Sequence, residues 1–186
     1  MRKSSLAALL LFCVCLVAPP VDARRTGVNY VSKVFRDGAY LPYVYDERDV
    51  VKRYGPGKQS VDRSGLICRL YRDAVSGFEV RITSNPDVAA EFRTIDEIRV
   101  SSVASGYVVL DKVEPLTGIS LKGVRIGDPL ERVHKAVRST MKWDSVVEQI
   151  SGVPADRVCG YQEDGSNVCY YVRQNKVVAM AVGFGP

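Results

Sequence analysis

The order of secondary-structure signals is the feature that most constrains the fold of this chain. In the first half, Asp46 precedes apolar residues at helical spacing, and Gly55-Pro56-Gly57 ends that segment. Three strand candidates follow, at 66–72, 78–83 and 96–102. The last two alternate apolar and polar residues, as half-buried strands do. This half therefore predicts a helix packed on a small antiparallel sheet.

The second half repeats that order, beginning at Asp128, which corresponds to Asp46. Pro129 follows it at the expected first helical position, and an apolar stripe runs from Leu130 to Val137. A second short helix is predicted over 144–150, because Gly152 and a proline follow it. Three strand candidates come next, at 157–162, 168–173 and 176–184.

We therefore predict an α+β fold of two tandem repeats, each with one or two short helices packed on a small antiparallel sheet. The repeats span 24–102 and 118–186, and 103–117 links them. One mixed sheet with helices at irregular intervals is the alternative. The aromatic stretch 24–45 predicts one or two short strands, which Gly38 and Pro42 interrupt.

The first 23 residues have the pattern of a cleavable secretory signal peptide. Arg2 and Lys3 precede an apolar run over 6–17, and Val21 and Ala23 suit the peptidase. A membrane-spanning helix needs ~20 apolar residues, so this run predicts export rather than an anchor. The processed chain is thus predicted to be periplasmic or secreted, without stable membrane insertion.

The cysteines support an oxidising compartment. Cys13 and Cys15 leave with the signal, since the residues before them are not the small ones that precede a lipidated cysteine. Cys159 and Cys169 are equidistant from Asp164 in a turn sequence, which predicts a disulfide across a hairpin. A bridge from Cys68 to Cys159 is the rival pairing.

Catalytic machinery is not evident in the sequence, so no catalytic, metal or cofactor site is predicted. His134 is the only histidine, and it lies on the flank of an apolar helical stripe. Aspartates at helix starts are explained by capping, and no glycine-rich phosphate loop follows a strand.

Tyrosine and arginine residues gather on the strand face opposite the apolar one, and these residue types are enriched at protein-binding hot spots. The candidate binding residues are Arg69, Tyr71, Arg81, Arg99, Arg157, Tyr161, Tyr171 and Arg173. Five arginines favour an acidic partner, which is a protein patch, anionic lipid or a polyanionic envelope glycan. Nucleic acid is not expected, because an exported protein works outside the compartment that holds it, and the net charge of +5 for the full chain is too small to indicate it. A merely solvated sheet face is the alternative.

The letters over 118–137 read as a short strand, then Gly127-Asp128, then a helix, and they resemble a motif of small bacterial outer-membrane-assembly lipoproteins. The paired helix-plus-sheet pattern resembles the β-lactamase-inhibitor-protein fold. That resemblance implies two repeats that present one concave sheet surface to a protein partner.

We therefore expect an exported, non-catalytic protein-binding module of the inhibitor or envelope-assembly type. A small secreted enzyme using carboxylates and a purely structural envelope protein are the alternatives. A deep pocket that joins two or more carboxylates favours the enzyme, whereas a broad tyrosine and arginine surface favours binding.

Overall fold

The computed structural model describes residues 29–35, 42–103, 116–140 and 142–184. The predicted signal peptide and most of the predicted linker lie outside these residues, as does much of the stretch 24–45. Within the described part of the chain, eight strands and a few short helices form an α+β fold.

The helical elements are α1 (Tyr30–Phe35), the 3-10 turn η1 (Pro42–Val44), α2 (Glu47–Tyr54) and α3 (Leu130–Val137). The first four strands are β1 (Lys58–Val61), β2 (Ile67–Arg72), β3 (Glu79–Ser84) and β4 (Glu97–Ser101). The last four are β5 (Lys142–Ile150), β6 (Val153–Tyr161), β7 (Ser166–Arg173) and β8 (Lys176–Phe184).

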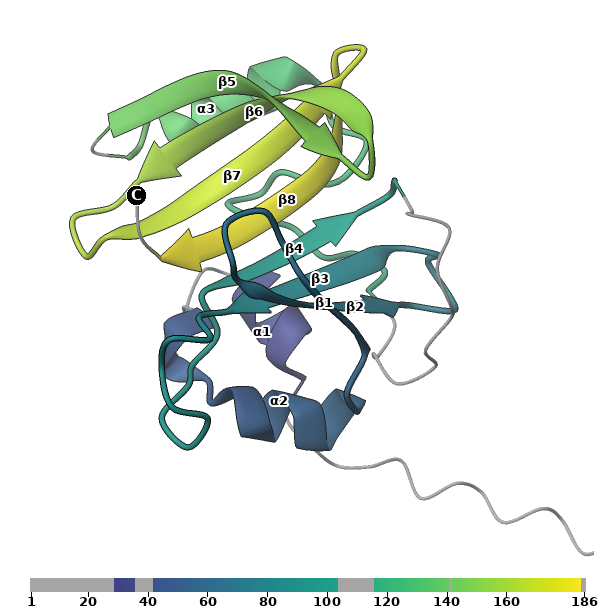
Figure 1. Ribbon diagram of the computed structural model, residues 1–186. Helices are drawn as coiled ribbons and strands as arrows, with labels where there is room; N and C mark the ends of the chain where they lie inside the picture. The colour runs from purple at the N-terminus through teal and green to yellow at the C-terminus, as the bar shows by residue number, and fades with distance from the viewer. Residues whose placement is uncertain (1–28, 36–41, 104–115, 141, 185–186) are drawn as a thin grey trace, which may run out of the picture.

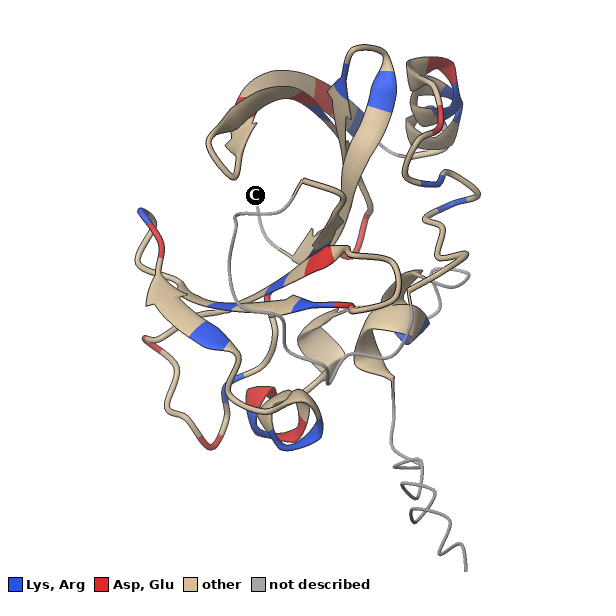
Figure 2. Ribbon diagram, turned by 90° about the vertical axis from the view of Figure 1, so that its right-hand side faces the viewer, with Lys and Arg blue, Asp and Glu red and all other residues tan. Residues whose placement is uncertain are grey.

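All eight strands belong to one antiparallel sheet in the order β1-β2-β3-β4-β8-β7-β6-β5 (Figure 1). The pairing of β4 with β8 joins the two halves, with Arg99 opposite Ala181. Seen from the side, the two halves meet at an angle, and the helices lie on the outer side of the bend (Figure 2). We call the opposite, concave side the open face of the sheet.

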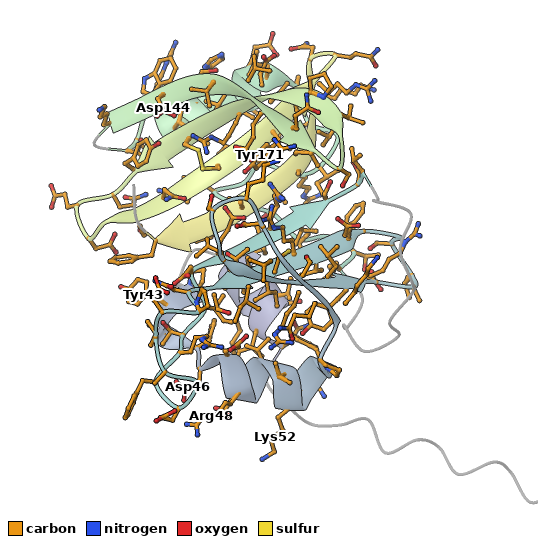
Figure 3. The ribbon with its side chains drawn as sticks, viewed as in Figure 1. Tyr43, Asp46, Arg48, Lys52, Asp144 and Tyr171 are labelled. Atoms are coloured by element: carbon orange, nitrogen blue, oxygen red, sulfur yellow. A yellow bond between two sulfur atoms is a disulfide. The ribbon has the colours of Figure 1, made fainter. Side chains whose placement is uncertain are left out.

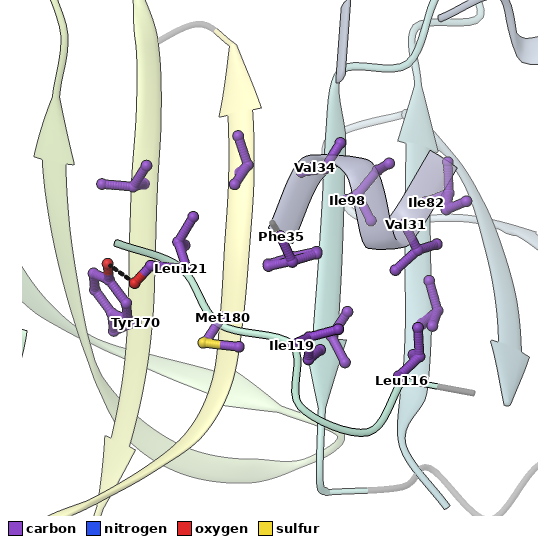
Figure 4. Packing of buried hydrophobic residues seen from close by; sticks show 14 of the residues in the cluster. Val31, Val34, Phe35, Ile82, Ile98, Leu116, Ile119, Leu121, Tyr170 and Met180 are labelled. Atoms are coloured by element: carbon purple, nitrogen blue, oxygen red, sulfur yellow. Dashed lines mark hydrogen bonds between the residues drawn. The ribbon is translucent and has the colours of Figure 1, made fainter. Parts of the chain in front are cut away.

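The main core lies between the helices and the sheet. Val31, Val34 and Phe35 of α1 pack over Ile82 and Ile98 (Figure 4). The segment before α3 crosses from the first half of the sheet, which Leu116 and Ile119 cover, to the second half, which Leu121 covers (Figure 4). The Tyr170 hydroxyl donates to the Leu121 carbonyl at 2.9 Å. Burying these apolar side chains is the main force that holds the helices on the sheet.

Period-two alternation predicted most strands correctly, because Val80, Ile82, Ile98 and Val100 are all buried in the helix-side core. One irregularity departs from the pattern. A register shift between Tyr171 and Val172 opposite β8 places Val177 in the helix-side core, whereas Val178 packs against the open-face cluster.

The helix predicted over 144–150 is wrong, since β5 occupies Lys142–Ile150. Its valines and isoleucine suit a strand, and all nine residues pair with β6 in one unbroken register. Ser151 and Gly152, both at positive φ, make the two-residue hairpin turn that leads into β6. Tertiary pairing here outweighs the helical spacing of the apolar residues.

The short strands predicted over 24–45 are also wrong in the described part of that range, which forms α1 and η1. Asn29 begins α1, because its Oδ1 accepts a hydrogen bond from the Ser32 amide at 2.8 Å. At the second predicted helix, Pro129 rather than Asp128 is the N-terminal cap. Asp128 Oδ2 accepts the Arg125 amide instead, at 2.8 Å.

Candidate functional site

A groove of about 320 Å³ runs along the open face where the two halves of the sheet meet. Strands from both halves line it, and the β1–β2 turn contributes Asp62 and Ser64. A second, apolar cluster forms part of its floor and includes Ala179, Ala181 and the cysteines of β6 and β7.

Five of the eight predicted binding residues line this groove, namely Arg81, Arg99, Arg157, Tyr161 and Tyr171. Strand register explains their meeting, because Arg81 lies opposite Arg99 and Arg157 lies opposite Tyr171. Tyr171 lies on the open face in the upper half of the molecule (Figure 3).

Arg69 and Tyr71 were placed on the wrong face, because they lie on the helix side of β2. Tyr71 is buried in the core, with its ring 5.8 Å from that of Tyr54 and its hydroxyl donating to the Gly55 carbonyl at 2.9 Å. Arg69 Nε donates to Glu47 of α2 at 3.0 Å. Both side chains therefore attach α2 to the sheet.

Arg173 is exposed at the end of β7 and does not line the groove. The sequence analysis groups Arg173 with the other candidate binding residues only because side chains alternate between the two faces of a strand. The structure thus separates the predicted set into five groove residues, two helix-side residues and one exposed strand end.

Arg99 is the most buried charge of the groove, with 7% of its surface exposed. Its guanidinium lies 5.3 Å from the centre of the Tyr171 ring and 3.6 Å from Glu148 of β5. Burial opposes the charge, but the Tyr171 and Glu97 side chains outweigh that effect and raise the pKa of Arg99. This arginine is a fixed cation beneath the groove surface.

Glu148 joins both halves of the site, because its other oxygen accepts from Arg157 at 3.1 Å. Tyr161 donates its hydroxyl to Asp144 Oδ2 at 2.8 Å, next to this pair. Burial raises the pKa of Tyr171 to about 12, so its phenol stays neutral and can act as a hydrogen-bond donor.

Arg81 belongs to a separate ion pair at the β1–β2 end of the groove. Its guanidinium lies 2.6 Å from Asp62, and its Nε donates to the Cys68 sulfur at 3.1 Å. The pair fixes the β1–β2 turn beside the groove, whose lining includes Asp62 and Ser64 of that turn.

Acidic residues are the part of the site that sequence reasoning missed. The groove lining contains three arginines and also four carboxylates, those of Asp62, Asp96, Glu97 and Glu148. The sequence pattern predicts a helix at Glu148 and no regular element at Asp62. A correct strand assignment for 142–150 would have placed Glu148 on the same face as Arg157.

Asp96 is the groove carboxylate whose pKa burial raises above 3.8. A group whose folded pKa is raised stabilises the protein at low pH, and that stability is lost as pH rises through the folded pKa. Asp96→Asn should therefore increase the stability at pH 7, by at most about 0.5 kcal/mol because solvent screens a half-exposed carboxyl. Urea melts at pH 7 and at pH 3 test this, and a gain of equal size at both values would contradict it.

The predicted disulfide between Cys159 and Cys169 is confirmed, with the two Cα atoms 4.1 Å apart across paired β6 and β7. The rival bridge from Cys68 is wrong, because Cys68 is a buried free thiol. The disulfide agrees with an exported protein, since such bonds persist in oxidising compartments.

Removing this disulfide with the double variant Cys159→Ala/Cys169→Ala should lower the free energy of unfolding by about 2–3 kcal/mol, as expected for a short closed loop. Urea melts with and without a reducing agent measure the effect. The control is Cys68→Ala, which should retain the full response to reductant. A double variant as stable as the parent chain would contradict the expected contribution.

His134 stacks edge-on against Trp143 of β5, with ring centres 5.8 Å apart. Among the residues that the structure describes, no group of three or more histidine, cysteine, aspartate or glutamate side chains has a metal-binding arrangement. The helices in those same ranges are too short or too polar for any of them to cross a bilayer.

No protein-family model matches this chain, and no curated protein matches it either. A search of solved structures finds similarity to an extracellular protein containing an SCP domain from Bacillus anthracis str. Ames, determined at 1.5 Å resolution. The TM-score is 0.47 at 10% sequence identity, over 75% of this chain and 43% of that protein. This chain therefore spans less than half the length of the protein it matches.

The resemblance predicted from residues 118–137 is wrong. The structural similarity found is to the SCP-domain protein and not to a β-lactamase-inhibitor-like or assembly-lipoprotein fold. The motif also requires a strand before the helix, whereas this segment forms turns with an isolated bridge between Leu121 and Val124.

Proposed function

We propose that this chain is an exported, non-catalytic protein-binding module whose groove on the open face receives a segment of a protein partner. The observation that carries the proposal is the meeting of Arg81, Arg99, Arg157, Tyr161 and Tyr171 in one groove, although they come from both halves of the chain. Arginine and tyrosine combine contact area with hydrogen bonding, which makes them frequent anchors at interfaces.

The groove residues divide into a fixed base and an accessible rim. Arg99 and Tyr171 are buried and hold each other in place, so they stabilise the shape of the site. Arg157 and Tyr161 are only partly buried, so a partner could contact them. A preformed base under accessible side chains lowers the entropy lost on binding.

Two buried polar atoms beside the groove have no partner within the described structure, the Arg157 Nε donor and the Asp144 Oδ1 acceptor. Each costs free energy if it stays unpaired. A polypeptide segment carries both carbonyl acceptors and amide donors, so it has the groups that these two atoms need.

The charges of the groove favour a mixed protein surface over a polyanion. Its three arginines face four carboxylates, and Arg81, Arg99 and Arg157 all lie in ion pairs. A polyanion would compete with Asp62 and Glu148 for those arginines. Of the acidic partners expected from the sequence, the paired charges of the groove therefore favour a protein segment that offers both hydrogen-bond donors and acceptors.

A matched pair of arginine variants tests the proposal. Processed chain carrying Arg157→Ala should capture its partner from host envelope extract about tenfold less well than the parent chain. Arg173→Ala removes the same charge outside the groove and should capture the partner normally. Thermal melts of both variants show whether they are folded. Equal capture by the two variants would contradict the proposal.

Salt dependence separates the two kinds of acidic partner. Binding of a mixed protein segment should weaken little as salt rises, whereas binding of a polyanion should fall steeply with salt. The second outcome would favour an envelope glycan or anionic lipid.

A small secreted enzyme is the second candidate, and Asp96 is the observation that favours it. A carboxyl with a raised pKa, in a groove with three other carboxylates, has the features of a general acid. Hydrolysis of envelope substrates that disappears in Asp96→Asn but persists in Arg173→Ala would support this function and displace the binding proposal.

We also propose that the two halves of the sheet are tandem repeats. Each half has four strands, and the strand order runs inward from β1 and from β5 to the central pair β4 and β8. A helix precedes each half, α2 before β1 and α3 before β5. Expression of each half alone would test whether either one can fold independently.

A further inference from the structure

The outer edge of the sheet at β5 (Lys142–Ile150) differs from what folded proteins usually leave exposed. Within the described part of the chain, β5 pairs with β6 on one side and with no strand on the other. Its nine residues contain no proline, glycine or register shift. Exposed edges are normally short, bulged, interrupted or charged, because unpaired amide and carbonyl groups recruit another strand, and of these protections β5 has only the charges, on Lys142, Asp144 and Glu148.

The opposite edge of the same sheet has that protection. β1 is four residues long and reads Lys58-Gln59-Ser60-Val61, so it offers little regular backbone and mostly polar side chains. β5 is more than twice as long as β1, and some of its apolar side chains are exposed to solvent. Val147 is 72% exposed and Trp143 is 47% exposed.

We propose that β5 pairs with β5 of a second copy of this chain, antiparallel, with the two-fold axis at Ser145. The residues of β5 are self-complementary in this register. Lys142 lies opposite Glu148 of the second copy on the open face, and Trp143 lies opposite Val147 on the helix face. Each contact occurs twice, as symmetry requires.

Neighbouring registers do not have this complementarity. An axis at Val146 places Asp144 opposite Glu148, and an axis at Asp144 places the two Asp144 carboxylates opposite each other. Like charges directly opposite each other destabilise a strand pair. An axis between two residues would place each residue opposite a residue of the second copy whose side chain points to the other face of the sheet. Of the three axes compared, only Ser145 pairs unlike charges and avoids a pair of like charges.

The side-chain orientations of β5 agree with this pairing. Glu148 and Asp144 belong to the open face, as their pairing with Ala155 and Cys159 of β6 shows. Trp143 lies on the helix face, where His134 of α3 stacks against it. The second copy would cover the exposed surfaces of Trp143 and Val147 and extend one sheet through both chains. This proposal does not depend on the proposed function.

Cysteine scanning tests the register directly. In Ser145→Cys the two introduced thiols would lie on the axis, within disulfide reach of each other, and mild oxidation should give a covalent dimer. In Gln149→Cys, also exposed on β5, the thiols would lie about 27 Å apart, so this control should stay monomeric on a non-reducing gel. Equal crosslinking of the two variants, or none of Ser145→Cys, would overturn the proposal.

Sedimentation measures the association itself. The processed chain should show a concentration-dependent dimer, and Lys142→Glu should raise its dissociation constant about tenfold, because two attractive pairs become repulsive. Lys135→Glu, which makes the same charge change on α3, should leave the dissociation constant unchanged. A chain that stays monomeric at all concentrations would overturn the proposal, as would a dimer equally sensitive to both substitutions.

Discussion

Ile98→Asp is expected to unfold this protein. Ile98 is 0% exposed in β4, between β3 and β8, and it lies beneath α1 (Figure 4). The substitution would put a carboxylate into an apolar layer with no cation to pair with it. Burial of an unpaired charge, together with the lost apolar contacts, should cost about 4 kcal/mol or more, a large part of the stability of a domain of this size.

Circular dichroism at 25 °C measures this effect, and the parent chain should show a cooperative melt that the variant lacks. Val75→Asp is the control, because Val75 is 67% exposed in the β2–β3 turn and the same change should cost little there. A variant at Ile98 that melts like the control would mean that α1 does not pack on β4.

Glu47→Ala should give the second largest loss, about 3–5 kcal/mol, because it removes the centre of a buried charge cluster. Glu47 is 5% exposed at the start of α2, and its carboxylate lies 3.0 Å from Arg69 and 3.2 Å from Arg93. The Ser84 hydroxyl donates to it as well, at 3.0 Å. Without the carboxylate, two mostly buried arginines lose their partner.

The pH dependence of Glu47 gives an independent check. Burial favours its neutral form, but hydrogen bonds from Arg69 and Ser84 outweigh burial and lower its pKa below 4.5. A lowered pKa gives stability that is present above the unfolded pKa and is lost as pH falls through the folded one. Acid titration should thus destabilise the parent chain below about pH 4.5 more steeply than Glu47→Gln. Parallel curves for the two chains would contradict this role.

These predictions separate the two faces of the sheet. The helix face carries the stability of the fold, through Ile98 and through the Glu47 cluster that holds α2. The open face carries a groove in which paired charges and tyrosines lie over a small apolar floor. Substitutions at accessible groove residues such as Arg157 should therefore change partner capture more than they change stability.

The candidate site could be predicted from the sequence only in part. Period-two alternation placed Arg81, Arg99 and Tyr171 on the open face, because each lies in a strand whose apolar residues mark the opposite side. The same rule failed on β2, where Arg69 and Tyr71 share the helix side with Ile67. There Tyr71 is an apolar core residue despite its hydroxyl, and Arg69 is neutralised by a helix. The sequence of β2 alone predicts neither the burial of Tyr71 nor the ion pair of Arg69.

Local chemistry determined the α+β class, the positions of α2 and α3, most of the strands and the disulfide. Turn residues and alternation act within a few residues of the chain, so they can be read from it. Tertiary structure alone decided that Lys142–Ile150 is a strand, since pairing with β6 outweighs its helical spacing. It also decided the groove, because β4 and β5 are the two ends of the run β4-β8-β7-β6-β5. Arg99 and Glu148 meet only because the sheet bends toward its open face (Figure 2). Contacts between residues so distant in sequence depend on strand order and register, which no local pattern specifies.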